Sequence, residues 1–396
     1  MKIGIPGYGF VRWGGGIDFL RIICGSIAVA KPEAEFHLLV PTNGPRVAIR
    51  KLLRRGWYGL TGRPMSLDKP PSHSHIMEFV RTSQFRIQMH KIDIGNAALV
   101  KASNRLGLQV MLPTFQPLRL PLDLPWLGYI PDFQHAYFPQ YFLPSEIVGR
   151  NKSYRRMLQK AKGVIVNSNA VANDIQRFMP GHRAVIYVLP FAAAPDPAWF
   201  DYGVQSFGAH PPYGRYFIIS NQFWQHKDHL TAFRAFAYVC REYPDLNLIC
   251  TGEMSDYRNP AYFPKLIQEA NALGITSRLH LLGLVPKSHQ IALMRRSLAV
   301  IQPTLFEGGP GGGSVFDAVS LGVSAIVSDI AINKEIAEPT VRYFRASDSN
   351  ALAAAMIERV KAGPESAKAV EELINSGKIR QRACGEVLLK AINEWL

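Results

Sequence analysis

A glycine-rich segment between two carboxylates is the strongest candidate for chemistry in this sequence. The run from Glu307 to Asp317 follows an expected strand and leads into an expected helix, and it contains Gly308, Gly309, Gly311, Gly312, Gly313 and Ser314. Backbone N–H groups of such glycines and of a helix N-terminus bind anions and suit a diphosphate. A carboxylate beside a phosphate is electrostatically costly. We therefore expect Glu307 and Asp317 to bind hydroxyl groups, as on a sugar or a ribose.

A second candidate lies between Ser220 and His229 and centres on a lysine. Lys227 is expected to open a helix, where the helix dipole disfavours a cation, so its position makes sense if it binds an anionic ligand. His226 and His229 raise the possibility of a metal site. However, no third ligand is close in sequence and Lys227 stands between them, so we expect no metal.

The first half contains a glycine loop of its own, with Gly14, Gly15 and Gly16 after the expected strand Lys2–Pro6. It departs from the dinucleotide-binding fingerprint because Arg12 occupies the position of the third glycine and no acidic residue ends the second strand. A flexible loop at a helix N-terminus remains, which can approach a phosphate or a sugar closely. A tight turn without a ligand is the alternative.

Short apolar strands alternate with helical segments along the chain. The expected strands are Lys2–Pro6, Glu35–Pro41, Leu108–Leu112, Leu127–Ile130, Gly163–Asn167, Ala184–Leu189, Tyr216–Ser220, Leu246–Thr251, Leu279–Leu282, Leu298–Pro303 and Ala325–Ser328. The expected helices are Asp18–Ala30, Ser145–Lys162, Ala170–Phe178, Lys227–Glu242, Tyr262–Leu273, Ser288–Arg296, Gly313–Leu321 and Ile332–Ala337. This alternation predicts an α/β fold with parallel sheets covered on both faces.

The domain organisation follows from a Pro-, Ala- and Gly-rich linker at Pro190–Arg215. We expect two doubly wound domains, residues 1–200 and 201–378. Ligands of such sheets bind at the carboxyl ends of the strands, so the site is expected in a cleft between the domains.

Composition excludes several classes. Of the 396 residues, 47% are hydrophobic and 19% are charged, a globular balance. No apolar run reaches about 18 residues, and the N-terminus lacks the features of a signal peptide. The four cysteines are scattered, which favours reduced thiols and a cytoplasmic protein.

The basic residues are distributed unevenly. Residues 1–200 carry 25 Lys and Arg against 11 Asp and Glu, a net charge of +14, whereas residues 201–396 carry 20 against 19. An anionic partner for the first half is therefore expected, either a membrane surface, a phosphorylated substrate or nucleic acid. A basic surface that only aids solubility is the alternative. Residues 46–58 have helical spacing, with Ile49, Leu52 and Leu53 on one face and basic residues beside them. This pattern predicts a helix that lies on an anionic membrane, or else a surface helix packed on the core.

Several motifs, in the right order, resemble retaining glycosyltransferase family 4. In the second half they are Lys227 after a strand, Gly252, the turn ending in Val285 and Pro286, and the segment from Pro303 to Gly322. In the first half they are Tyr129–His135 and Val164–Ser168. The resemblance implies the GT-B fold, which is two Rossmann-like domains facing across a cleft. It also implies a nucleotide-sugar site on the C-terminal domain and a final helix, residues 379–396, that crosses back to the first domain.

The resemblance also assigns roles. Glu307 matches the acid that contacts the donor sugar, Asp317 the ribose ligand, and Lys227 the lysine that holds the diphosphate. His135 resembles the histidine close to the transferred sugar, with Asp132 beside it on the acceptor side. The remaining donor-binding positions are Asn221, Gln222, Gly252, Val285, the glycines and serine of the 308–314 run, and Gly14, Gly15 and Gly16.

Two departures from the family pattern matter. Nine residues separate the two acids instead of seven, and the second acid is Asp317. The family's arginine shortly before the lysine is Asn221 or Gln222 here. Arg295 or Arg296 is a candidate replacement, and a plain position on a helix surface is the alternative for both.

The resemblance implies retaining transfer of a sugar from a nucleotide sugar to a polysaccharide, oligosaccharide or lipid-linked acceptor of the cell envelope. The sugar is expected to be a hexose, with mannose among the options. The leaving phosphate takes the acceptor proton, and no metal or other cofactor is expected. Together with the basic first half, this predicts a peripheral enzyme on the inner face of the plasma membrane. A sugar-nucleotide epimerase of the same fold and a non-catalytic nucleotide-sugar-binding partner are the alternatives. No recognition motif supports nucleic-acid binding.

Overall fold

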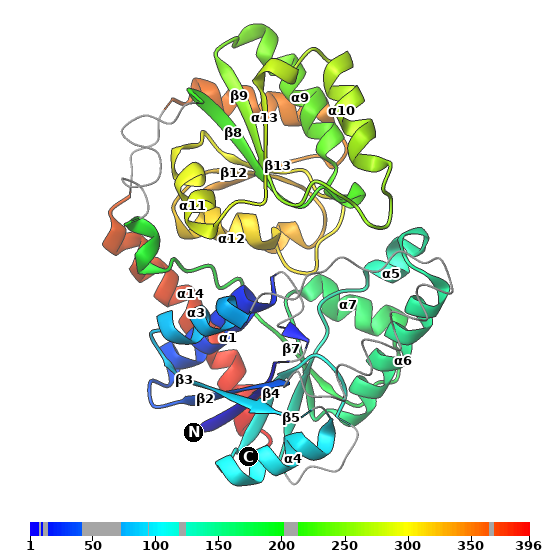
Figure 1. The fold of residues 1–396 in the computed structure, drawn as a ribbon, viewed down its shortest axis with the longest axis vertical. Helices are drawn as coiled ribbons and strands as arrows, with labels where there is room; N and C mark the ends of the chain where they lie inside the picture. Colours follow the sequence, from blue (N-terminus) through cyan, green and yellow to red (C-terminus); the bar gives the residue numbers. More distant parts are fainter. Residues whose placement is uncertain are drawn as a thin grey trace. The chain divides into compact units, whose positions relative to one another are not determined.

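The computed structural model describes residues 1–7, 9–10, 15–41, 73–93, 95–118, 124–201, 213–363 and 368–396. They form two compact units (Figure 1). The first domain comprises Met1–Pro131, Leu143–Pro190 and Gln381–Leu396, and the second comprises Asp132–Phe142 and Phe191–Arg380. Unlike the contiguous division that the sequence suggested, the chain enters the second domain twice. Gly14 and the amphipathic segment 46–58 lie outside the described residues.

The first domain contains a parallel seven-stranded sheet in the order β3-β2-β1-β4-β5-β6-β7. Its strands are β1 (Lys2–Pro6), β2 (Glu35–Pro41), β3 (Arg86–Ile92), β4 (Val110–Thr114), β5 (Trp126–Tyr129), β6 (Gly163–Val166) and β7 (Val185–Val188). Its helices are α1 (Gly16–Ala30), α3 (His73–Thr82), α4 (Asn96–Leu106), α6 (Pro144–Lys160) and α7 (Asn169–Phe178). The inner strands β4, β5 and β6 are buried throughout, as a sheet covered on both faces requires.

The second domain repeats the scheme with six parallel strands in the order β10-β9-β8-β11-β12-β13. These are β8 (Arg215–Ser220), β9 (Leu246–Thr251), β10 (Leu279–Gly283), β11 (Val300–Gln302), β12 (Ala325–Ser328) and β13 (Val341–Phe344). The helices are α5 (Gln134–Tyr137), α9 (His229–Glu242), α10 (Tyr262–Ala272), α11 (Lys287–Arg296), α12 (Gly312–Ser320) and α13 (Ser349–Lys361). Short 3-10 turns are η2 (Pro139–Tyr141), η3 (Pro197–Phe200), η4 (Gln225–Lys227), η5 (Thr276–Arg278) and η6 (Asn333–Glu335).

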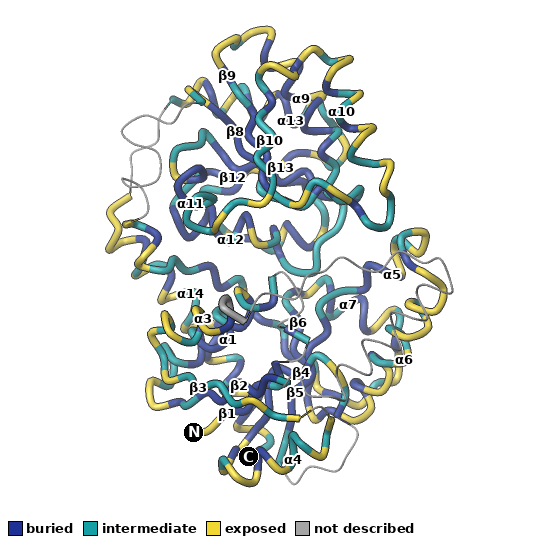
Figure 2. Tube along the Cα trace, viewed as in Figure 1, coloured by how far each residue is buried: buried dark blue, intermediate teal, exposed yellow. Residues whose placement is uncertain are grey.

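Alternating side chains of β8 divide the core of the second domain into two layers. Phe217 and Ile219 pack with residues of α9, α10 and α13, whereas Tyr216 and Ile218 pack with residues of α11 and α12. Because successive side chains of a strand point to opposite faces, this division follows from the period of two. Figure 2 shows the central strands as the buried part of the tube and the helices as its partly exposed cover.

The strand order decides where the loops meet. In the second domain β8 lies between β9 and β11, so the direction of winding reverses at β8 and β11. Ligands of doubly wound sheets bind beyond the carboxyl ends of the strands at such a reversal. The loops that leave β8 and β11, which carry the lysine and the glycine-rich candidates, therefore begin next to each other.

Helix α14 (Val370–Asn393) contributes its residues from Gln381 onward to the first domain. A Cβ atom at Gly385 would lie 2.1 Å from the carbonyl oxygen of Ser26, so only glycine permits this close approach to α1. Tyr187 donates a hydrogen bond to Glu394, and Trp395 Nε1 donates to the Tyr187 hydroxyl at 3.2 Å. None of the helices in the described part of the chain is both long and apolar enough to cross a membrane.

Candidate active site

Lys227 is positioned by the 3-10 turn η4 that follows β8. Our expectation that Lys227 opens the next helix is wrong, because α9 begins two residues later with Asp228 as its N-cap. The Asp228 carboxylate accepts hydrogen bonds from the backbone N–H and the hydroxyl of Thr231, at 3.4 and 2.7 Å. An N-terminal aspartate of this kind is a stronger start signal than the lysine before it. Lys227 therefore does not stand at the first position of α9, and its contacts alone indicate a role for it.

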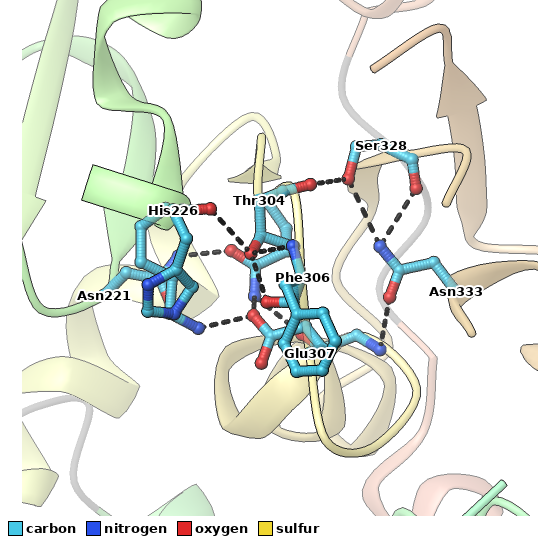
Figure 3. Close-up of polar contacts among 10 residues, drawn as sticks. Asn221, His226, Thr304, Phe306, Glu307, Ser328 and Asn333 are labelled. Carbon is cyan, nitrogen blue, oxygen red and sulfur yellow. Dashed lines mark hydrogen bonds and ion pairs between the residues drawn. The ribbon is translucent and has the colours of Figure 1, made fainter. Parts of the chain in front are cut away.

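Lys227 and Glu307 form an ion pair at the reversal of the sheet. Lys227 Nζ donates a hydrogen bond to Glu307 Oε1, and the two side chains are only 12% and 10% exposed. Gln302 Nε2 donates to the same carboxylate oxygen at 3.0 Å, and Gln302 Oε1 in turn accepts from Asn221 (Figure 3). The sequence-predicted residues Asn221, Lys227 and Glu307 thus come together. Gln302 was missed, although a glutamine that ends an otherwise apolar strand was the available signal.

The glycine-rich run turns directly into the N-terminus of α12. Gly311 and Gly312 have φ angles of 70° and 62°, a conformation that favours glycine. A Cβ atom at Gly312 would also lie 3.0 Å from Glu307 Oε2, so the loop passes close to the carboxylate. Asn333 accepts a hydrogen bond from the Gly311 N–H at 2.9 Å and donates one to the carbonyl oxygen of Ser328 at 2.9 Å (Figure 3). The loop is therefore held in place from β12.

The first turn of α12 has the properties of an anion site. Helices leave their first N–H groups without intrahelical partners, and the macrodipole makes this end electropositive. Within that turn the hydroxyl of Ser314 is buried and has no hydrogen-bond partner among the residues that the structure describes. Gly309 O accepts from the Gly312 N–H at 3.2 Å, while Gly308 and Gly313 complete the run. Buried polar groups are normally satisfied, so Ser314 supports an incoming polar ligand.

Asp317 has a lysine partner of its own. Lys287, the first residue of α11, places its Nζ 2.5 Å from Asp317 Oδ2 and 5.2 Å from the centre of the Trp199 ring. Gln290 Nε2 lies 3.5 Å from the same carboxylate oxygen and donates to the Ser220 hydroxyl at 2.7 Å. Each of the two acids that flank the glycine run is therefore compensated by one lysine. The sequence did not single out Lys287, because the pairing spans 30 residues.

The two histidines beside Lys227 have structural roles. Burial, reinforced by Lys227, Arg258 and His229, lowers the pKa of His226 to about 2, and burial with Lys227 lowers that of His229 to about 3. The carbonyl oxygen of His226 accepts from the Leu305 N–H at 2.8 Å, which ties the β8 loop to the β11 loop. In the described part of the chain, no three metal-ligating side chains are grouped closely enough to hold a metal ion.

His135 and Asp132 lie on the segment Asp132–Phe142, which packs within the second domain. Asp132 Oδ1 accepts from the Gln134 N–H at 2.9 Å. His135 is 1% exposed, and its ring lies 5.9 Å from the Phe133 ring and 6.2 Å, edge-on, from that of Phe142. The rings of Tyr137 and Phe138 contact that of Phe306, which precedes Glu307.

The remaining predicted positions fall into two groups. In the second domain, a Cβ atom at Gly252 would lie 2.1 Å from the carbonyl oxygen of Asn221, so this turn beside the β8 loop requires glycine. Gln222 O accepts from the Trp224 N–H at 2.8 Å, and Val285 follows β10. In the first domain, Gly15 is the N-cap of α1 and Gly16 is its first residue.

Arg295 is engaged elsewhere. Its Nη1 donates to the carbonyl oxygens of Trp199 and Phe200, at 3.4 and 3.0 Å, and its guanidinium lies over the Phe200 ring. These contacts hold η3 and give Arg295 a structural role. Lys287 is instead the additional cation that the fold brings to the flanking acids.

Comparison with known proteins adds to this geometry. Residues 207–378 match the family model of glycosyl transferases, group 1. The match covers most of the domain that contains both lysine–carboxylate pairs. No curated protein sequence matches the chain.

Solved structures with the same fold include three that cover nearly the whole chain. Anabaena Alr3699/HepE, in complex with UDP and glucose, is 15% identical with a TM-score of 0.59 over all of both chains. Sucrose-phosphate synthase from Thermosynechococcus elongatus is 13% identical, with a TM-score of 0.56 over 100% of this chain and 94% of that one. WaaG, a glycosyltransferase involved in lipopolysaccharide biosynthesis, is 12% identical, with a TM-score of 0.56 over 100% and 99%. The predicted two-domain Rossmann-like GT-B fold is confirmed.

Proposed function

We propose that the protein transfers a sugar, with retention of configuration, from a nucleoside diphosphate donor to a glycan or lipid-linked acceptor. The observation that carries this proposal is the pair of lysine–carboxylate contacts on either side of a glycine run that opens a helix. A diphosphate fits the electropositive helix end and the lysines, whereas the hydroxyls of the sugar and ribose suit the carboxylates.

In this proposal, stabilisation of the charge on the leaving diphosphate accelerates sugar transfer. When the bond between the anomeric carbon and the diphosphate oxygen breaks, the sugar becomes oxocarbenium-like and the leaving group gains negative charge. Lys227 and the first-turn amides of α12 stabilise that charge, and losing one such donor typically costs about 3 kcal/mol in the barrier. Glu307 orients the sugar, Asp317 the ribose, and the leaving phosphate takes the acceptor proton on the same face. With this positive charge supplied by the protein, the proposal includes no metal ion.

The donor is tested by binding before turnover. A panel of UDP, GDP, dTDP and ADP sugars is screened by thermal shift, headed by UDP sugars because the Anabaena protein was solved with UDP. A donor at about 100 times its Kd stabilises the fold by about 2.7 kcal/mol. Product analysis with the donor alone then separates a transferase from an epimerase, because only the epimerase releases an altered nucleotide sugar without an acceptor. Absence of any nucleotide-sugar binding would contradict the proposal.

The charge of the first domain supports an anionic membrane as a partner. Along α6, Lys152, Arg155, Arg156 and Lys160 are exposed at helical spacing, and Val148 beside them is 65% exposed. Each basic residue of a surface helix strengthens binding to an anionic leaflet by about 1 kcal/mol. An exposed apolar side chain can also insert into the leaflet. We therefore propose a peripheral enzyme on the cytoplasmic side of the plasma membrane, acting on an envelope acceptor.

Vesicle co-sedimentation tests the membrane partner. The variant with Lys152, Arg155, Arg156 and Lys160 all changed to Gln is expected to lose most binding to anionic vesicles at low salt. A matched variant changes Arg234, Arg241, Lys265 and Arg342, exposed cations of the second domain, and is expected to bind normally. Equal binding by both variants would argue against α6 as the membrane face. Failure of the unmodified protein to bind anionic vesicles would remove the membrane from the proposal without affecting sugar transfer.

A further inference from the structure

The guanidinium of Arg258 lies at the junction of three segments of the second domain. Arg258 belongs to the loop between β9 and α10, and its Nη1 donates to Gln134 Oε1 at 3.1 Å. The rings of Phe142, Trp224 and Tyr257 surround it, with centroids 4.7, 5.1 and 5.2 Å from its Cζ. Cation–π contacts of a partly desolvated arginine are among the stronger side-chain interactions of this kind.

One side of this junction is tied to the turn that carries Lys227. The carboxylate of Asp256, which is 4% exposed, accepts from the N–H groups of Gln225 and Arg258, both at 3.0 Å. Asn259 Nδ2 also donates to Gln225 Oε1 at 2.9 Å. Two of these hydrogen bonds join the Asp256–Asn259 loop to Gln225 of η4, and the third lies within the loop. Because η4 ends at Lys227, the loop helps to order the turn of the lysine.

The other side carries the segment that contains His135. Gln134 precedes His135, and Phe142 packs on its ring, so two of the Arg258 contacts are made to the immediate neighbours of the histidine. At the far side of the segment, the rings of Tyr137 and Phe138 lie 5.7 and 6.1 Å from that of Phe306, which precedes Glu307. The segment is thus held between the Lys227 turn and the Glu307 loop.

Local structure does not hold this segment. Its only α-helix, α5, is four residues long, and helices of this length are not stable by themselves. Both neighbouring stretches of chain, up to Pro131 and from Leu143, belong to the first domain. The place of His135 relative to Lys227 and Glu307 therefore depends on side-chain contacts, and those of Arg258 join Gln134 and Phe142 to Trp224.

We propose that Arg258 is a positioning residue for sugar transfer, which holds the Asp132–Phe142 segment, and with it His135, in register with Lys227 and Glu307. This proposal rests on the proposed function of the same site. We do not assign Arg258 to binding of the nucleotide sugar, because its guanidinium contacts three rings and donates to Gln134. Misplacing a catalytic group by about 1 Å costs roughly 100-fold in rate, so a loosened segment lowers kcat without weakening nucleotide binding.

The experiment compares Arg258→Ala and Arg258→Lys with Arg234→Ala. Lysine keeps the charge but lacks the planar fork that bonds Gln134 and faces the rings, so it is expected to rescue only part of the function. Arg234, an exposed arginine of α9 whose nearest acid, Glu269, is 3.8 Å away, is the matched control. Three quantities are measured: hydrogen exchange of residues 132–142, the Kd of the nucleoside diphosphate by calorimetry, and kcat for transfer.

We expect Arg258→Ala to speed exchange of residues 132–142 at least about tenfold and to lower kcat roughly 10- to 100-fold, with the diphosphate Kd within about twofold. Unchanged exchange, or unchanged kcat, would overturn the proposal. A Kd that rises in parallel with the loss of kcat would also overturn it, because Arg258 would then be a donor ligand. If the unmodified protein transfers no sugar, the proposed function fails, whereas the exchange of residues 132–142 still decides whether Arg258 anchors the segment.

Discussion

Replacing Glu307 with Gln should tighten the binding of a free nucleoside diphosphate while slowing transfer. In the structure Lys227 is paired with Glu307, and the two side chains are about nine-tenths buried. An arriving diphosphate must share Lys227 with that carboxylate and tolerate its negative charge. Glutamine keeps the shape of the side chain and can still accept from Gln302, but it removes the charge and releases Lys227 for the ligand.

The size of the effect follows from the burial of the pair. Two unit charges about 6 Å apart at an effective dielectric constant of about 20 repel by about 2.8 kcal/mol. A charge-assisted hydrogen bond contributes about 1.5 to 3 kcal/mol. Both estimates predict tighter binding of the same order, so the Kd of the diphosphate should fall roughly 10- to 150-fold. Transfer should nevertheless fall about 100-fold or more, because the sugar loses the charged acceptor that orients it.

Calorimetry with UDP, GDP, dTDP and ADP, followed by thermal unfolding with and without the best ligand, measures both consequences. Without ligand the variant should melt below the unmodified protein, because Lys227 is left buried and uncompensated. With ligand this difference should shrink. Glu358→Gln is the control, since the Arg342–Glu358 pair is 67% and 60% exposed and such pairs contribute about 0 to 1 kcal/mol. Weaker or unchanged diphosphate binding by Glu307→Gln would refute the reasoning.

Three further predictions concern the charged groups of the two domains. Lys227→Met should weaken diphosphate binding at least about tenfold by calorimetry, and an unchanged Kd would exclude Lys227 as a phosphate ligand. Lys287→Met should lower the unfolding free energy by about 1 kcal/mol or more in urea titrations, because it leaves the buried Asp317 without its cation, and adding Asp317→Asn should restore part of it; strictly additive losses would argue against the pairing. In the first domain, burial lowers the pKa values of His37 and His90, whose rings are hydrogen-bonded at 3.0 Å. The folded state then binds fewer protons, so this stability is complete above the ordinary histidine pKa of about 6.5 and declines as the pH falls below it. His90→Gln should reduce the change of the urea unfolding midpoint with pH between about pH 7 and pH 5. An unchanged dependence on pH would show that the pair does not contribute.

The sequence predicted the inner strands of both sheets because they are short and apolar. It missed β3, whose exposed and half-buried residues alternate at the edge of the sheet, so that no continuous apolar run marks it. It placed a helix at Ile332–Ala337, where the structure has only the 3-10 turn η6, in which Asn333 bonds the glycine loop. Local composition could not show either result, because both depend on neighbours that are distant in the sequence.

The candidate site likewise contains residues that the sequence predicted and residues that it missed. Doubly wound topology brings the ends of β8 and β11 together, so the encounter of Lys227 with Glu307 follows from strand order and could be anticipated. Lys287 and Arg258 act through long-range contacts, and nothing in the adjacent sequence marks a polar side chain that serves a partner 30 or 124 residues away. Such contacts are fixed by packing and not by periodicity.

The segment Asp132–Phe142, which packs within the second domain, shows how long-range contacts bear on function. A domain boundary at residue 200 assigns His135 to the first domain, yet its immediate neighbours bond Arg258 and pack on Phe306 within the second. The second domain cut out as residues 191–380 would lack Gln134 and Phe142 and would leave the guanidinium of Arg258 without two of its partners. Because the Asp256–Asn259 loop also orders the turn of Lys227, the loss would extend to the proposed diphosphate site. The eleven inserted residues are therefore part of the architecture of that site, although the chain reaches them from the other domain.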